Sequence, residues 1–183
     1  MSNAVRIKKQ RITWGTAESP FGKVVLASTG KGVCLLSFGG NIRVELNWVK
    51  KKFPGCEFIR DLKKAKGIAR KAFNPETKRG EIILDLHGTV FQKKVWNALL
   101  GIPFGKTVSY EQVAIAAGNR KAVRAAAGAV ANNPVAYLVP CHRVIKKNGE
   151  LHNYGGGKMR KKRMLLWEHL ILSKNTPITC KTP

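Results

Sequence analysis

A cysteine followed by a histidine and an arginine is the most chemically suggestive feature of this 183-residue sequence. It stands in the pentapeptide PCHRV at positions 140–144, directly after the apolar run VAYLV. A free thiol is only a few per cent thiolate at neutral pH, and a nearby positive charge or a histidine base raises that fraction. Because His142 and Arg143 adjoin Cys141, the pattern indicates a nucleophilic cysteine at the edge of a core. A buried structural cysteine is the alternative, since adjacency along the chain does not make two side chains meet.

The other cysteines are Cys34, Cys56 and Cys180, and they form neither a C-x-x-C pair nor a close Cys/His spacing. We therefore expect neither a structural zinc site nor a disulfide framework, and a reducing compartment, the cytoplasm, is the natural location. The segment GIPFGKT at 101–107 resembles a phosphate-binding loop, but it has one residue too few between its glycines and follows a helical pattern. We interpret it as a connecting loop.

The charge balance points to an anionic partner. The chain has 34 Lys and Arg against 10 Asp and Glu, a formal net charge of +24. Nucleic acid is the first candidate and an anionic membrane surface the second, with a generally basic proteome as the neutral explanation. No apolar run approaches the ~20 residues that span a bilayer, no secretory signal is evident, and no basic amphipathic membrane-binding helix stands out. These observations favour nucleic acid.

Strand and helix patterns alternate over the first part of the chain. Strands are expected at 12–18, 23–28, 33–38 and 82–86, with a short edge strand at 58–59, and helices at 41–52 and 62–73. The second helix is strongly basic, with Lys63, Lys64, Lys66, Arg70 and Lys71, and our hypothesis is that it adds nonspecific affinity for DNA. This part predicts an α/β unit without recognisable chemistry.

Two helix-start signals follow. Thr89 and Gln92 fit one capping box, and Ser109 and Gln112 fit a second. Helices are expected from 89 to 100, from 109 to before Gly118, and from about 120 to 131, with a short turn at 118–119. Helix, tight turn and helix form a helix-turn-helix pattern. Its alanine-rich third helix suits close approach to DNA, but equally suits tight helix packing.

Several ordered motifs together resemble the O6-alkylguanine-DNA alkyltransferase family, also called methylated-DNA–protein-cysteine methyltransferases. PCHRV at 140–144 resembles the family's active-site signature, SYEQVA at 109–114 its first helix of the helix-turn-helix, and GNRKAVRA at 118–125 its turn and recognition helix. NNP at 132–134 and NYGGG at 153–157 lie at the expected distances from the cysteine. The resemblance is strong over 91–170 and weaker earlier, as in SPFGKVVLA at 19–27.

The resemblance implies a fold and a division into domains. It implies an α/β domain with an RNase H-like sheet at 1–88, then a mostly helical domain with a winged-helix-like helix-turn-helix at 89–172. The short, polar segment 173–183, with two prolines, is expected to be a loose tail. The second domain would carry the reactive cysteine. Some relatives hold a structural zinc in the first domain, but no ligand set for one is found in this sequence, and no cofactor is implied for the transfer.

The implied activity is DNA repair by irreversible, single-turnover transfer of an alkyl group from O6-alkylguanine, and more slowly from O4-alkylthymine, to Cys141. His142 would act as the base through a water, and Glu168 would orient it, with His169 as the competing candidate. Asn133 would hold the cysteine turn. The partner would be double-stranded DNA containing O6-alkylguanine, bound by a monomer in the cytoplasm at the nucleoid, without a membrane.

Base flipping supplies the remaining roles, because a buried thiol cannot reach O6 while the base stays stacked. By the resemblance, Tyr110 would crowd the rotating phosphate and donate a hydrogen bond to guanine N3, and Arg124 would fill the vacated space. The base pocket would be lined by Val144, Asn153, Tyr154 and Gly155. Some family members have a serine at the position of Gly155, whereas here only a backbone N–H could reach O6.

Three other functions compete with this one. A non-enzymatic DNA-damage-binding relative would lack the cysteine, so Cys141 argues against it. A transcription regulator would need a further metal-binding domain, for which the chain has neither room nor a cysteine cluster. An unrelated thiol hydrolase would not explain Tyr110, Arg124 and the basic charge together.

Overall fold

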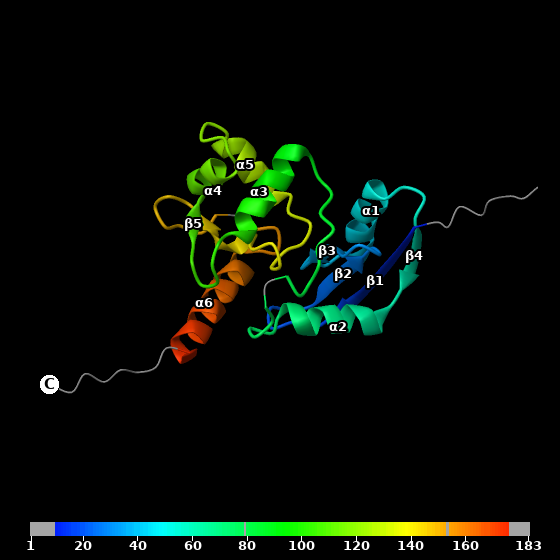
Figure 1. Cartoon of the computed structure of the whole chain (residues 1–183). Helices are drawn as coiled ribbons and strands as arrows, with labels where there is room; N and C mark the ends of the chain where they lie inside the picture. The colour runs from blue at the N-terminus through cyan, green and yellow to red at the C-terminus, as the bar shows by residue number, and fades with distance from the viewer. Residues whose placement is uncertain (1–9, 79, 153, 176–183) are drawn as a thin grey trace, which may run out of the picture. The chain divides into compact units, whose positions relative to one another are not determined.

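The computed structural model describes residues 10–78, 80–152 and 154–175, and it falls into two units, residues 1–87 and 88–183 (Figure 1). The first unit is built on a mixed four-stranded sheet with the order β3-β2-β1-β4. Its strands are β1 (Arg11–Ala17), β2 (Val24–Ser28), β3 (Val33–Ser37) and β4 (Glu57–Arg60). β2 pairs antiparallel with β1 and β3, whereas the edge strand β4 runs parallel to β1. The expected strands at 12–18, 23–28, 33–38 and 58–59 are thus confirmed.

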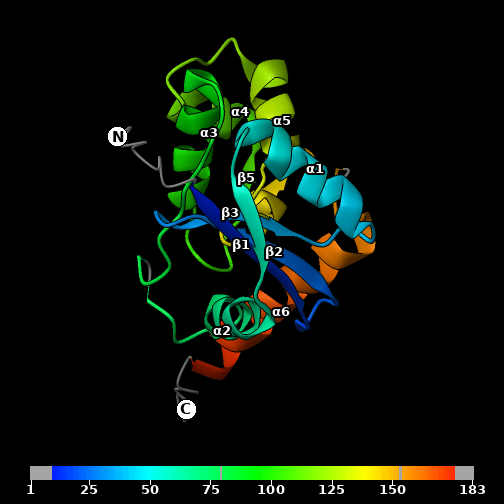
Figure 2. The same ribbon diagram turned by 90° about the vertical axis from the view of Figure 1, so that its right-hand side faces the viewer.

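Helices α1 (Ile42–Lys52) and α2 (Leu62–Ala72) cover opposite faces of this sheet (Figure 2). On the α1 face, Ile12 and Val25 pack with Val49 in a buried apolar cluster. On the α2 face, a Cβ added to Gly15 would lie only 2.8 Å from Ala65 Cβ, so glycine lets α2 lie close to β1. Because both faces are covered, every residue of β2 is buried.

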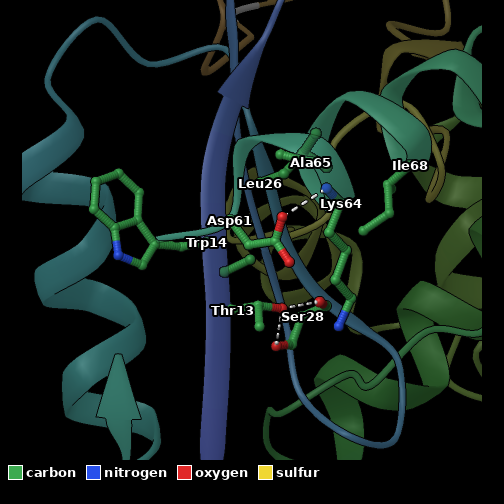
Figure 3. Close-up of a pocket in the computed structure, with 9 residues that line it drawn as sticks. Thr13, Trp14, Leu26, Ser28, Asp61, Lys64, Ala65 and Ile68 are labelled. Carbon is green, nitrogen blue, oxygen red and sulfur yellow. Dashed lines mark hydrogen bonds between the residues drawn. The ribbon is translucent and has the colours of Figure 1, made fainter. Parts of the chain in front are cut away.

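Side-chain oxygens cap the N-termini of both helices. Asn41 accepts hydrogen bonds from the backbone of α1, and Asp61 accepts one from Lys64 N at 2.8 Å. Figure 3 shows the Asp61 cap beside the pair Thr13 and Ser28, whose hydroxyls lie 2.8 Å apart across β1 and β2. These caps satisfy backbone N–H groups that would otherwise lack partners.

The strand expected at 82–86 is wrong. This segment makes only one bridge to the sheet, between Val33 and Leu84. Val33 exchanges both backbone hydrogen bonds with the segment, but Asp85 then binds Thr29 through its side chain at 2.6 Å and His87 at 2.8 Å. The segment therefore passes the end of β3 instead of pairing along it.

The second unit contains α3 (Val90–Leu100), α4 (Tyr110–Ala116), α5 (Val123–Ala131) and α6 (Lys158–Asn175). Both expected capping boxes are present, at Thr89 with Gln92 and at Ser109 with Gln112. The short strands β5 (Val108–Ser109) and β6 (Val144–Ile145) pair in parallel. Trp96 of α3 donates a 2.9 Å hydrogen bond to Ala129 O, which ties α3 to α5.

The third helix begins later than predicted, at Val123 rather than near Arg120. Gly118 ends α4 with a positive φ of 86°, and Asn119 then accepts a hydrogen bond from Lys121 N through its side chain. This local side-chain bond holds the chain in a turn before α5 starts. α6 continues to Asn175, so residues 173–175 belong to this helix and not to the expected tail. None of the helices in the described ranges is long and apolar enough to cross a membrane.

Candidate active site around Cys141

Cys141 opens a single 3-10 turn, η1 (Cys141–Arg143), which leads directly into β6. The preceding run alternates between buried and half-buried side chains, with Val135 and Val139 fully buried. Cys141 N donates to Val139 O at 2.8 Å, and this bond closes the turn. The apolar run thus delivers the thiol at the edge of the core, as its pattern predicted.

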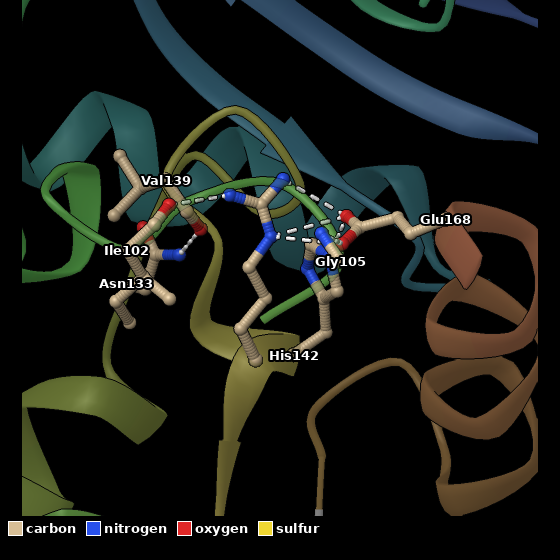
Figure 4. A network of polar contacts seen from close by, with 7 residues as sticks. Ile102, Gly105, Asn133, Val139, His142 and Glu168 are labelled. Carbon is tan, nitrogen blue, oxygen red and sulfur yellow. Dashed lines mark hydrogen bonds and ion pairs between the residues drawn. The ribbon is translucent and has the colours of Figure 1, made fainter. Parts of the chain in front are cut away.

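Asn133 holds this turn from beneath. Its Nδ2 donates to Val139 O at 2.8 Å and lies 3.1 Å from Cys141 Sγ, while its Oδ1 accepts from Val135 N at 3.0 Å. Figure 4 shows the Asn133 amide against the Val139 carbonyl. The structure therefore places Asn133 on both the backbone and the sulfur of the cysteine turn.

The thiol is only 6% exposed, and burial raises its pKa above the ordinary value because a thiolate loses hydration there. The Asn133 hydrogen bond and the positive charge of Lys161 act in the opposite direction without cancelling the burial. Cys141 is therefore a neutral thiol at rest, and it needs a base to become a nucleophile.

His142 and Glu168 form a buried pair, in which Nε2 and Oε1 lie 2.7 Å apart and both side chains are 0% exposed. Glu168 projects from α6, while the competing candidate, His169, is exposed. Burial lowers the pKa of His142 despite the neighbouring carboxylate, so the imidazole is neutral at physiological pH. A neutral imidazole can accept a proton.

The other ring nitrogen of His142, Nδ1, is placed to accept a proton. Nδ1 is buried and has no hydrogen-bond partner among the described residues. Buried polar atoms are rarely left without a partner, and such an atom in a native structure signals a bound water or a chemical role. With its proton held on Nε2 by Glu168, the imidazole offers a lone pair at Nδ1.

Glu168 is also bound by Arg143. The guanidinium donates to both carboxylate oxygens at 2.9–3.1 Å and to Ile102 O at 2.7 Å, and Gly105 N donates to Glu168 Oε2 at 2.8 Å. Figure 4 shows Ile102, Gly105 and Glu168 around this network. Burial raises the pKa of Glu168, but the hydrogen bonds and charges of His142 and Arg143 outweigh it and leave the pKa below its usual range. Arg143 was expected to act on the thiol, but its guanidinium binds the Glu168 carboxylate instead.

Two tyrosines lie near Cys141. Burial raises the pKa of Tyr110, and negative charge on Cys141, once its thiol has lost the proton, raises that pKa further. The same two causes raise the pKa of Tyr154 well above its usual value. The Tyr154 hydroxyl is buried, but it lacks a well-directed hydrogen-bond partner in the described part of the chain. Both phenols therefore stay protonated and can donate.

β-Pairing links Tyr110 to the cysteine turn. Ser109, the residue before Tyr110, pairs with Ile145, which follows η1 by two residues. The ring of Tyr110 packs edge-on against His152, with the ring centroids 5.7 Å apart. The two-stranded ribbon thus brings the start of α4 to the same place as Cys141.

The predicted pocket residues differ in their surroundings. Val144 is fully buried, and its carbonyl accepts a hydrogen bond from Lys161 Nζ. Gly155 is exposed, and a Cβ added there would meet nothing within 4 Å. Asn153 lies outside the described residues. Arg124 is exposed on α5 and takes no part in the buried network.

Sequence reasoning missed two residues at this site. Lys161 is buried, with 1% exposure, and its charge lowers the pKa of the Cys141 thiol. Its spacing from Met164 and Glu168, two other buried residues of α6, is a helical stripe that could have revealed it. Tyr137 stacks on the imidazole of His142, with ring centroids 5.4 Å apart and planes inclined by 6°. No local sequence pattern predicts the stacking of Tyr137 on His142. In the described residues, no three His, Cys, Asp or Glu side chains gather as metal ligands would.

Comparison with known proteins shows which family this chain resembles. Residues 90–170 match the family model of the 6-O-methylguanine DNA methyltransferase DNA-binding domain. The chain is 41% identical over 143 residues to a methylated-DNA–protein-cysteine methyltransferase of Methanosarcina acetivorans, covering 76% of this chain and 87% of the relative. It is 34% identical over 161 residues to the bifunctional transcriptional activator/DNA repair enzyme Ada of Escherichia coli, covering 84% of this chain but only 44% of Ada.

A solved structure agrees with these sequence matches. The chain is similar to Mycobacterium tuberculosis OGT in complex with DNA, with a TM-score of 0.70 and 35% identity, covering 85% of this chain and 92% of that one.

Proposed function

Because this chain belongs to the methylated-DNA–protein-cysteine methyltransferase family, we propose that it repairs DNA by moving an alkyl group from O6-alkylguanine to Cys141. The observation that carries the proposal is the buried thiol turn supported by the pair His142 and Glu168. O4-Alkylthymine would be a slower substrate. DNA is the partner, and the basic charge of the chain suits it.

The transfer is a displacement at the alkyl carbon. His142 accepts the thiol proton at Nδ1, through a water, and Glu168 stabilises the resulting imidazolium. A bond forms from Cys141 Sγ to the alkyl carbon as the bond from that carbon to O6 breaks, and the electron pair leaves on guanine. The departing guanine takes up a proton at N1 from water and the imidazolium returns its proton to water, so the products are a neutral base and a thioether. No group restores the thiol, which makes the reaction a single turnover.

Recognition would use the helix-turn-helix of α4 and α5. The exposed Arg124 would occupy the space left by the flipped nucleotide, and Tyr110 would donate a hydrogen bond to N3 of the leaving guanine. That donation stabilises the negative charge which develops on the base. The pocket would be lined by Val144, Asn153, Tyr154 and Gly155. The winged-helix-like and RNase H-like descriptions of the two units, a monomeric state and a cytoplasmic location belong to this proposal.

The test follows the DNA product. A duplex with one O6-methylguanine is incubated with wild-type protein and with Cys141→Ala, and the nucleosides are separated after digestion. We expect wild type to convert O6-methylguanine to guanine up to one equivalent per chain, and Cys141→Ala to convert none. Conversion by Cys141→Ala, or conversion well beyond one equivalent, would refute the mechanism.

Base flipping has its own test. Arg124→Ala should slow transfer from a duplex by about 100-fold, because unstacking a base costs a few kcal/mol. Transfer from a single strand should change much less, because that strand needs no flipping. Lys121→Ala, at an exposed position in the turn before α5, is the control for lost charge alone. Equal slowing on both substrates would remove Arg124 from the flipping step.

A further inference from the structure

Tyr137 has a backbone conformation that its side chain does not favour. Its φ is +70°, and it is the one non-glycine residue with a positive φ in the described part of the chain. Bulky side chains rarely adopt this region, and such strain persists only where the surroundings impose it, often at functional sites. The surroundings of Tyr137 are therefore informative.

The strained backbone presents the Tyr137 ring to His142. The two rings are nearly parallel, and the centroid distance of 5.4 Å corresponds to an offset stack. Trp167 packs edge-on against Tyr137 at 6.3 Å, and Phe104 packs edge-on against Trp167 at 6.1 Å. A row of three aromatic rings, from the loop after α3, the run before Cys141 and α6, thus lies behind the imidazole.

Each group around His142 controls a different degree of freedom. Glu168 fixes the Nε2 edge at 2.7 Å, but a single hydrogen bond leaves the ring free to tilt about that contact. A stacked neighbour limits the tilt and keeps water off one face of the ring. The remaining edge, Nδ1, has no partner among the described side chains and is the edge that must face the proton.

We propose that Tyr137 is a positioning residue for the transfer reaction: its ring face holds His142 in the plane and the water-poor setting that keep Nδ1 available as the base. This inference rests on the proposed function, in which His142 accepts the Cys141 proton. Burial and the nearby Glu168 carboxylate raise the pKa of the Tyr137 phenol, so it keeps its own proton and does not act as the base. The ring face, not the hydroxyl, is the acting part.

The proposal predicts opposite outcomes for two substitutions. Tyr137→Phe keeps the ring and should transfer the methyl group within about 2-fold of wild type. Tyr137→Leu removes the ring, and its transfer rate constant at saturating DNA should fall by about 3- to 10-fold, the range that corresponds to one aromatic stack. Lesion affinity, measured with each substitution in a Cys141→Ala background, should not change.

The pH profile separates positioning from general loss of stability. Burial is the main cause of the low pKa of His142, so water admitted by Tyr137→Leu should raise that pKa. Because the base must be neutral, the acid limb of the rate profile should move to higher pH. Leu99→Val, a buried substitution in α3, is the stability control and should leave the limb in place.

Direct titration of the four histidine rings by NMR reads the same pKa without any transfer reaction. It therefore keeps failure of this inference distinct from failure of the proposed function. An unshifted His142 titration and acid limb in Tyr137→Leu would overturn the proposal, and so would equal losses in Tyr137→Phe and Tyr137→Leu. If Tyr137→Leu does not fold, Tyr137→Met makes the same comparison with an unbranched side chain.

Discussion

Glu168 Oε1 lies 2.7 Å from His142 Nε2, and neither side chain is exposed to solvent. This contact fixes the proton on Nε2 and turns the lone pair of Nδ1 away from the carboxylate. The same carboxylate receives Arg143 and Gly105 N, so one buried side chain joins α6, the cysteine turn and the loop after α3. The stability of the unit and its chemistry therefore depend on the same group.

Neutralising Glu168 should destabilise the protein strongly. Glu168→Gln leaves the buried Arg143 guanidinium without its counter-charge, which typically costs about 3–5 kcal/mol of unfolding free energy. Urea unfolding measures the loss. Glu150→Gln, at an exposed carboxylate that pairs with Lys146, is the matched control and should change little. Equal effects of the two substitutions would contradict the role given to the buried network.

The charge of Lys161 should lower the pH at which Cys141 becomes reactive. Because this charge lowers the pKa of the thiol, its removal in Lys161→Met should raise that pKa. At a fixed neutral pH less thiolate is then present, so alkylation of Cys141 by iodoacetamide should slow and its rate profile should move to higher pH. Peptide mapping separates Cys141 from Cys34, Cys56 and Cys180. Lys162→Met, at an exposed neighbouring lysine, should leave the profile unchanged; a similar shift in both variants would rule out a local effect of Lys161.

A hydroxyl at position 155 should help the leaving guanine. The added Cβ meets no atom within 4 Å, so Gly155→Ser fits without displacing a neighbour. One hydrogen bond to the developing charge on O6 would speed transfer by about 2- to 10-fold. Single-turnover rates on the methylated duplex measure the gain, and Gly155→Ala controls for the backbone. If serine and alanine behave alike, the hydroxyl does not reach O6.

The basic face of α2 should add nonspecific DNA affinity. Lys63, Lys64, Lys66, Arg70 and Lys71 are all exposed, while Ala65, Ala69 and Ala72 form the buried face. None of the five cations forms a salt bridge within the described ranges. Replacing all five with glutamine should reduce the slope of log K against log salt by about 0.9 for each lost phosphate contact.

The control for this measurement uses cations elsewhere on the same unit. Replacing Lys50, Lys51 and Lys52, at the end of α1, tests whether any loss of charge has the same effect. A slope unchanged by the five α2 substitutions would remove this helix from the contact surface.

The local sequence predicted most of the secondary structure because its signals are local. Capping residues such as Thr89 and Ser109, together with glycine turns, mark helix ends by interactions that span three or four residues. The segment at 82–86 has a strand-like composition, but pairing depends on the neighbour it meets, and only Val33 is in register. The start of α5 was misjudged because the Asn119 side chain competes with the helix.

The candidate site was predictable where a motif carries it. Cys141, His142 and Glu168 were named from the resemblance to a family, whereas Lys161 stands in a run of basic residues where only packing distinguishes the buried one. Arg143 was expected to act on the thiol, but its guanidinium binds Glu168. The stacking of Tyr137 depends on a positive φ, which tyrosine rarely adopts, so the residue type gave no reason to predict the contact.

The most direct test of the central claim is the mass of the intact protein after reaction. Wild type and Cys141→Ala are each incubated with a duplex that contains one O6-methylguanine, and the modified peptide is then mapped. The account predicts a gain of one methylene on wild type, located at Cys141 and saturating at one per chain, and no gain on Cys141→Ala. An unmodified wild-type protein that still binds the lesion tightly would contradict transfer and point to damage binding alone, and a methyl group on another residue would contradict the assignment of Cys141.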